Sequence, residues 1–439
     1  MTIPASLPRA ASFAAILNLF DTYKESWIRQ RVWGPMQTLL TIFALVEPGR
    51  ASSYQSACKT AFAWADRRFG WTNEPDATGF MRARARVTER ESAHLLEAAK
   101  TLAHQTLGRT KRLILGLLPI GVDGSILHMP RSEDLIKEYG VPKDRFGIET
   151  CHYPQALLVT AWDLVRRIPL AWSLRTFASS ERTALIDLLM QLPQNALLII
   201  DRGYPSDVVF GAILDSGRHF VARMVCSEGA SWSEVASFLA SGKRDAIVPV
   251  EVGVGKSRRT VKLRMVLRVF DVGRPHKHQK RETMVIITSV TDRSLTAREL
   301  CRLYGTRWGI ESIYREMKAV AKIEQWHGRN VDFIRQELML LLVWFCFAAM
   351  FAAAALATKQ LCCVKEHAWR ANTRRVFESI AMVMDALIAL VSRPPTQAHD
   401  IVRRADAALR AMCRWMLRVR PGRTFPRIPL HPYARSLAK

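Results

Sequence analysis

The sequence of 439 residues has few cysteines and no cysteine pattern of a disulfide or zinc framework. There are eight, and no two of them form a C-x-x-C pair or combine with histidine at the spacing of a zinc site. This argues against a small metal-stabilised module. The cysteines are typical of buried thiols in a reducing compartment, and we expect a cytoplasmic protein.

The sequence also lacks a recognisable secretory signal, internal repeats and low-complexity tracts. The short apolar stretch at 13–20 is interrupted by Asn18 and ended by Asp21, and no small-residue cleavage pattern follows it. With 49% hydrophobic residues, the chain has enough apolar material for several buried cores. Its length favours two to four globular domains.

Acidic residues are scarce compared with basic ones. Lys and Arg number 64 and Asp and Glu 39, a formal net charge of +25 that is spread along the whole chain. This excess favours a polyanionic partner such as DNA. Charge alone leaves open a ribosome-associated or merely soluble basic protein.

Long hydrophobic runs are rare, and one of them is long enough to span a membrane. Residues 338–357 carry no charge, and a run of about 20 apolar residues can span a bilayer. However, nearly half of the run is Ala or Met, and it continues a charged helical stretch that ends at Glu337. We therefore expect a buried core helix and no membrane partner, with a membrane span as the alternative.

The first 107 residues read as helices. Apolar residues recur at helical spacing over 28–46, 52–65 and 89–107. A basic stretch at 78–87 contains Arg82, Arg84 and Arg86. We expect a helical N-terminal DNA-binding domain over 1–107, and a plain helical bundle fits the pattern equally well.

Residues 108–357 change to an α/β pattern. The expected strands are 113–122, 155–162, 168–175, 196–200 and 219–224, with helices at 180–192 and 206–216. A β-rich insertion follows over 224–293, and a helix from 296 to about 325 closes the core. Residues 358–439 form a helical basic C-terminal region that could serve in dimerisation.

Within the insertion, residues 260–270 alternate between apolar and largely basic positions, as a strand with two different faces does. The basic positions are Lys262, Arg264 and Arg268. They could follow the phosphates of DNA, and an ordinary solvated strand face explains the pattern equally well.

Two aspartates stand where strands are expected to end. Asp123 follows the strand at 113–122, and Asp201 follows the strand at 196–200. Phosphodiester chemistry without a covalent enzyme intermediate uses two metal ions about 4 Å apart, held by carboxylates. Either aspartate alone is more typical of a turn or a helix cap.

The third carboxylate comes from the expected helix at 296–325. At about 100° per residue, Tyr304, Arg307, Glu311 and Lys318 share one face, an arc of about 60°. Glu316 lies about 140° around the helix from Glu311 and is not expected at the same site. Without the two aspartates, a salt-bridged surface helix would be the better interpretation.

These motifs resemble those of one enzyme family. The pattern Y-x-x-R-x-x-x-E-x-x-x-x-x-x-K at 304–318, with D-G-S at Asp123 and D-R-G-Y at Asp201, is similar to the signature of DDE transposases of the insertion sequence 4 family. The resemblance covers about 110–357. It implies a ribonuclease H-like catalytic core with a β-rich insertion, flanked by helical N- and C-terminal domains.

The resemblance also implies a reaction. Asp123, Asp201 and Glu311 would be catalytic and would hold two Mg²⁺ or Mn²⁺ ions, while Tyr304, Arg307 and Lys318 contact DNA. Trp308 is a candidate for stacking on a base. The expected partners are transposon terminal inverted repeats and target double-stranded DNA, bound by a homodimer. An inactive DNA-binding relative and a nuclease on the same fold are the alternatives.

Overall fold

We describe the protein from a computed structural model. The structure describes residues 33–48, 53–69, 71, 74–108, 113–226, 232–274, 277–362, 369–380, 407 and 409–418. The apolar stretch at 13–20 and most of the expected C-terminal region at 358–439 lie outside these residues.

The centre of the fold is an eight-stranded, mostly antiparallel sheet with the order β3-β2-β1-β4-β5-β8-β7-β6. Its strands are β1 (Leu118–His128), β2 (Gln155–Asp163), β3 (Ile168–Thr176), β4 (Ala196–Ile200), β5 (His219–Met224), β6 (Asp245–Val252), β7 (Arg259–Arg274) and β8 (Lys277–Thr288). The short strands β9 (Trp369–Arg370) and β10 (Leu417–Arg418) pair with each other. The mixed α/β class is therefore confirmed.

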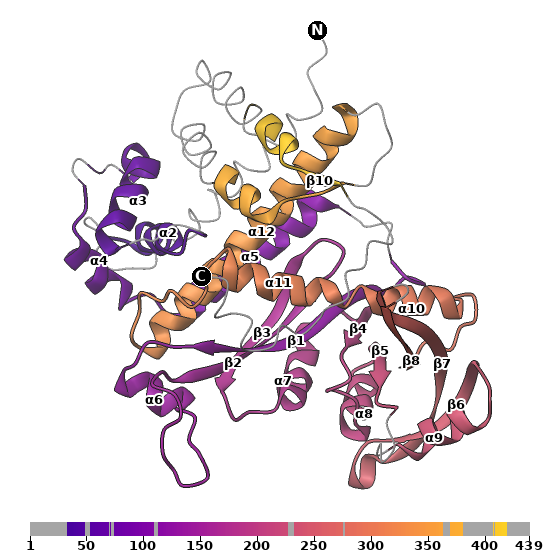
Figure 1. Cartoon of the computed structure of the whole chain (residues 1–439). Helices are drawn as coiled ribbons and strands as arrows, with labels where there is room; N and C mark the ends of the chain where they lie inside the picture. Colours follow the sequence, from indigo (N-terminus) through magenta and orange to yellow (C-terminus); the bar gives the residue numbers. More distant parts are fainter. Residues whose placement is uncertain are drawn as a thin grey trace.

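Helices lie on both sides of this sheet, and those of the N-terminal segment lie further from it (Figure 1). They are α2 (Pro35–Leu45), α3 (Tyr54–Phe69), α4 (Ala77–Arg84), α5 (Glu89–Leu107), α6 (Glu133–Tyr139), α7 (Glu181–Leu188), α8 (Asp207–Asp215), α9 (Ser233–Ala240), α10 (Ala297–Gly305), α11 (Trp308–Ala319) and α12 (Val331–Cys362). Helices α7, α8 and α9 share one hydrophobic cluster with one face of the sheet. Helices α10, α11 and α12 pack on the other face.

The pairing of β1 sets the geometry of the candidate site. β1 runs parallel to β4, with Gly121 opposite Ile199, and antiparallel to β2. Continuing the β1–β4 register by two residues brings Asp123 level with Asp201. The prediction that Asp123 follows a strand is wrong, because β1 continues to His128 through its pairing with β2. Asp201 does directly follow β4.

The β-rich segment extends the same sheet, because β8 pairs with β5. The expectation that Arg264 belongs to an exposed basic face is wrong. Arg264 is buried and forms two hydrogen bonds with the Asp245 carboxylate, at 2.9 and 2.6 Å, and it also donates to the carbonyl of Leu295. Lys262 and Arg268 are exposed on the same strand.

The helix expected over 296–325 is two helices. α10 begins with a capping box between Thr296 and Glu299 and ends at Gly305. A turn follows, and α11 begins at Trp308 and ends at Ala319. Arg307 therefore lies at the junction of two helices, and the single helical arc drawn through Tyr304 and Lys318 does not describe their geometry.

The long apolar run forms part of a core helix, α12. It is long and apolar enough to cross a membrane, yet 89% of its most apolar window is buried inside the protein. Trp344 stacks on Phe43 of α2 with ring centroids 4.2 Å apart and donates a hydrogen bond to the Phe43 carbonyl. The described N-terminal helices thus share one hydrophobic core with α12.

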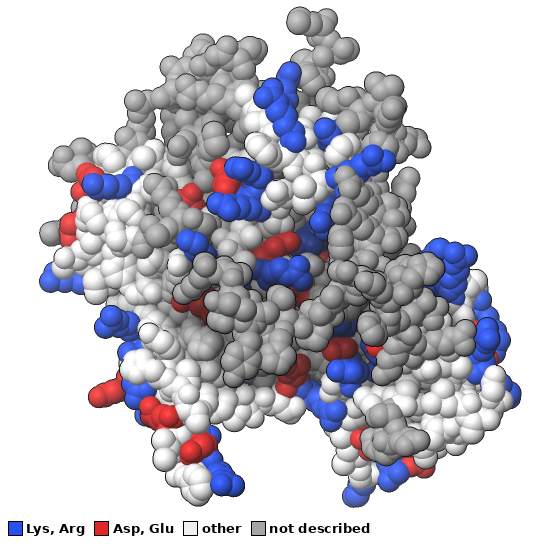
Figure 2. Space-filling model, in the orientation of Figure 1, with Lys and Arg blue, Asp and Glu red and all other residues white. Residues whose placement is uncertain are grey.

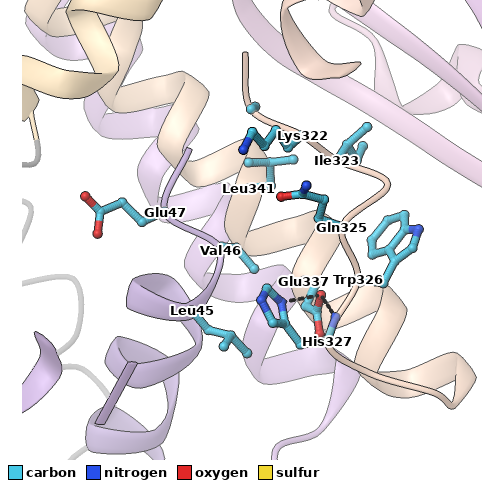
Figure 3. Close-up of a pocket in the computed structure, with 11 residues that line it drawn as sticks. Leu45, Val46, Glu47, Lys322, Ile323, Gln325, Trp326, His327, Glu337 and Leu341 are labelled. Atoms are coloured by element: carbon cyan, nitrogen blue, oxygen red, sulfur yellow. Dashed lines mark hydrogen bonds and ion pairs between the residues drawn. The ribbon is translucent and has the colours of Figure 1, made fainter. Parts of the chain in front are cut away.

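A buried ion pair fastens α4 to α12. The Arg84 guanidinium lies 2.7 Å from the Glu337 carboxylate, and both side chains are almost completely buried. Glu337 also accepts hydrogen bonds from the backbone N–H groups of His327 and Gly328. Figure 3 shows Glu337 and His327 beside a small pocket whose lining includes the end of α2. Arg84, in the predicted basic stretch at 78–87, is thus a buried structural residue.

Candidate active site

Four residues of the signature meet at the ends of β4 and α10. The Tyr304 hydroxyl donates a hydrogen bond of 3.3 Å to Oδ1 of Asp201. The Arg307 guanidinium donates a 2.7 Å hydrogen bond to Oε1 of Glu311, and its Nε lies 3.7 Å from Oδ1 of Asp201. Arg307 therefore bridges two carboxylates that are far apart in the sequence.

Arg307, the basic member of this bridge, is shielded from water. The side chain of Arg307 is 9% exposed, whereas those of Asp201 and Glu311 are 36% and 25% exposed. Burial alone would lower the pKa of Arg307, but Asp201, Tyr304 and Glu311 together raise it. The guanidinium thus stays charged, and the two carboxylates keep an edge open to solvent.

Tyr304 lies deeper than the carboxylates. It is buried, and this burial raises the pKa of its hydroxyl to about 12, with the charge of Asp201 adding to the effect against that of Arg307. Tyr304 is consequently a hydrogen-bond donor and not a base at neutral pH.

Asp123 stands on β1 beside this group. Its burial raises the pKa of the carboxyl to about 6. The charges of Glu181 and Asp201 also raise it, whereas the Gly124 N–H and the charge of Arg307 lower it. A bound cation would favour the ionised form of this carboxyl, because its charge would offset both the cost of burial and the repulsion from the other carboxylates.

Helix α11 is fastened along β1, which sets Glu311 relative to Asp123. The Tyr314 hydroxyl, one turn after Glu311, is 2.8 Å from the carbonyl oxygen of Asp123, to which it can donate. The Lys318 ammonium donates a 2.6 Å hydrogen bond to the carbonyl of Ile126. The close approach leaves little room at Gly121, where a Cβ would lie 2.8 Å from a Cδ of Leu164 and 3.2 Å from Cβ of Ile310.

Other predicted residues lie differently. Trp308 is half-exposed at the start of α11, and the Arg307 guanidinium lies 5.0 Å from its ring centre. Glu316 points away from this group and pairs with Arg167 at 2.6 Å. In Figure 2, Lys and Arg side chains gather at the end of the molecule where β6 and β7 lie.

Sequence reasoning missed several neighbours of the site. Tyr314 and Glu181 were not singled out, and neither was Arg223 of β5, whose charge lowers the pKa of Tyr304. Tyr314 could have been found from its position three residues after Glu311 on one helix. No sequence signal joins Glu181 to Asp123, because their proximity depends on the sheet.

Comparisons with known proteins identify the family of this chain. Residues 119–346 match the family described as "Transposase DDE domain". The chain is also 25% identical over 320 residues to "Transposase InsG for insertion sequence element IS4" of Escherichia coli (strain K12), an alignment that covers 71% of this chain and 67% of that protein. The matched residues span more than half of the sequence, and the chain therefore belongs to the DDE transposases.

Proposed function

We propose that this DNA transposase cleaves the ends of its mobile element and joins them to target DNA with Asp123, Asp201 and Glu311 as its catalytic residues. The observation that carries the proposal is the buried Arg307, which contacts Asp201 and Glu311 together. The alternative, an ordinary ion pair between Arg307 and Glu311 on the surface of a helix, does not account for the contact of Arg307 with Asp201 at the end of β4.

The carboxylates supply the oxygen ligands that Mg²⁺ or Mn²⁺ prefers. Two such ions, when bound, would activate the attacking oxygen and stabilise the leaving oxygen. Within the described ranges no three His, Cys, Asp or Glu side chains group closely enough to hold an ion. We propose that Asp123, Asp201 and Glu311 complete the site when Arg307 releases a carboxylate and turns to a DNA phosphate.

We also propose that β1 to β5 form a ribonuclease H-like core. The support is the strand order β3-β2-β1-β4-β5, in which β1, β2 and β3 are antiparallel and β4 and β5 run parallel to β1. In this arrangement the β-rich segment at 224–293 is an insertion that lengthens the sheet.

The DNA would lie over the exposed side of this site. Tyr304 and Arg307 would position the phosphate at the cleaved bond, and the half-exposed Trp308 could stack on a base. Lys262 and Arg268 are exposed and could contact phosphates further along the DNA. We exclude the buried Arg264 from this surface.

We also propose how the protein assembles on DNA and what each segment of the chain contributes. A homodimer would bind two terminal inverted repeats and one target duplex, in the cytoplasm and at the nucleoid. Residues 1–107 would contribute DNA contacts, 108–357 the catalysis and 358–439 dimerisation. The described helices of 33–107 pack on α12, so this segment would act together with the core.

A cleavage assay tests the proposed function. Purified protein is incubated with Mg²⁺ and a DNA fragment that carries both ends of the mobile element. We expect a linear fragment released at both ends, and none when a chelator replaces Mg²⁺. Nicks alone would instead indicate a nuclease, and binding without any break an inactive relative.

Lys318→Ala should weaken binding to the element's end and lower the salt slope of binding by about one unit, because one phosphate contact is lost. The measurement is an electrophoretic shift assay over a series of salt concentrations. Lys137→Ala, an exposed lysine on α6, is the matched control and should keep the wild-type slope. A lower melting temperature with an unchanged slope would show that Lys318 serves only to hold α11 on β1.

A further inference from the structure

A fourth acidic side chain reaches the site from the other face of the sheet. Glu181 is the first residue of α7, which Ser180 caps. Its carboxylate lies directly against β1, because a Cβ at Gly124 would be 2.6 Å from both its Cδ and its Oε1. Glycine at 124 thus leaves the space that the Glu181 side chain fills, next to Asp123.

The start of α7 is held in place by the loop that carries Asp201. Arg182 donates a 2.8 Å hydrogen bond from Nε to the carbonyl of Gly203, in the D-R-G-Y motif. The position of Glu181 is therefore coupled to that of Asp201.

A buried tyrosine hydroxyl near Glu181 lacks a well-formed hydrogen bond in the described part of the chain. Tyr204, the last residue of the D-R-G-Y motif, is 1% exposed, and its hydroxyl makes no well-formed hydrogen bond among the described residues. It is within reach of the Glu181 carboxylate, with which it makes at most a weak hydrogen bond. A poorly paired buried hydroxyl is unfavourable, and a metal-bound water could pair with it.

We propose that Glu181 is a fourth acidic residue of the metal site and binds, together with Asp123, a divalent cation. The inference rests on the proposed function and adds a ligand to it. The Glu181 carboxylate fills the space at Gly124, the residue after Asp123, within β1. The nearby Arg307 guanidinium is already engaged by Asp201 and Glu311, and a metal ion would supply a positive charge for Asp123 and Glu181.

The test measures metal binding apart from catalysis. Mn²⁺ is titrated into the full-length protein, and free Mn²⁺ is followed by electron paramagnetic resonance. Glu181→Gln, which removes the charge at nearly constant volume, should weaken Mn²⁺ binding about tenfold, as expected for a group that supports a metal site. It should also raise the Mg²⁺ concentration needed for half-maximal cleavage.

Glu133→Gln is the matched control, because Glu133 is also the first residue of a helix capped by serine and lies in α6, outside the site. It should bind Mn²⁺ as the wild type does. If Glu181→Gln melts at a lower temperature, Glu181→Asp, which keeps the charge and shortens its reach, replaces it and should also bind more weakly. Unchanged Mn²⁺ affinity in the folded variant would overturn the role of Glu181 alone, whereas a wild type that binds no Mn²⁺ would overturn the metal site as a whole.

Discussion

Glu311→Gln should lose at least about a hundredfold in cleavage rate, because it removes the charge of a metal ligand while keeping nearly the same volume. The reason is geometric. Glu311 is the only carboxylate of α11 that contacts Arg307, and through it Glu311 joins the group around Asp201. Binding to the element's end should be retained, because the phosphate contacts lie on other residues.

Glu316→Gln is the matched control for this experiment. Glu316 is on the same helix, yet its carboxylate pairs with Arg167, which is 43% exposed. Such an ion pair contributes about 0.2–1 kcal/mol to stability and nothing to the site, so cleavage should stay within a few-fold of the wild type. An active Glu311→Gln beside a dead Glu316→Gln would show that the helical register, and the family alignment with it, is wrong.

Arg84→Met should destabilise the protein by about 3–5 kcal/mol, because it leaves the Glu337 carboxylate buried without its cation. Arg84 also donates hydrogen bonds to Gln336 and to the Phe333 carbonyl, so the substitution breaks several contacts with α12 at once. The loss is measured as the free energy of unfolding in urea. Arg82→Met, an exposed arginine on the same helix, should change that free energy by less than about 0.5 kcal/mol.

The double variant Arg84→Met/Glu337→Met tests the cause. Removing both charges should restore part of the stability, since an apolar pair of similar size carries no desolvation cost. A double variant that is as unstable as the sum of the two single variants would show that packing, not the unpaired charge, causes the loss.

The pH dependence of the free energy of unfolding tests the charge of Glu337 in a second way. Burial opposes ionisation of Glu337, but Arg84 and His327 hold its pKa below the ordinary value, so its contribution should be lost only as the pH falls below the ordinary carboxyl range.

Much of the fold could be predicted from local patterns. The strands β4 and β5 and the helix α5 have the predicted bounds, because each is a short apolar run or a helical repeat between clear turn or capping residues. Thr88 caps α5 with Glu91, for example. The buried state of α12 was predicted from the Ala and Met content of its apolar run and from the charged stretch that precedes that run.

Other features depend on partners that are distant in the sequence. Asp123 was placed at a strand end because the apolar run at 113–122 stops there, yet pairing with β2 carries β1 on to His128. Arg264 fitted an alternating basic face, but its burial depends on Asp245 of the neighbouring strand and on the carbonyls of Asp292 and Leu295. The break between α10 and α11 was missed as well, since Gly305 and Gly309 are tolerated within helices at a modest cost.

The site was predictable in its composition more than in its geometry. The signature named Tyr304, Arg307 and Glu311, and the structure places them together with Asp201. The 78-residue offset of the β1–β4 register, which brings Asp123 level with Asp201, appears only with the sheet. The contact of the Glu181 side chain with Gly124 likewise depends on how α7 packs on the sheet, which the sequence does not reveal.

The most direct test of the proposed site is a paired assay of Asp123→Ala and Asp201→Ala on DNA that carries the element's ends. Each variant should bind this DNA with nearly wild-type affinity and produce no Mg²⁺-dependent cleavage, because a metal ligand is lost and no phosphate contact is. Mg²⁺-dependent cleavage near the wild-type rate in either variant would contradict the assignment of these carboxylates as the catalytic centre.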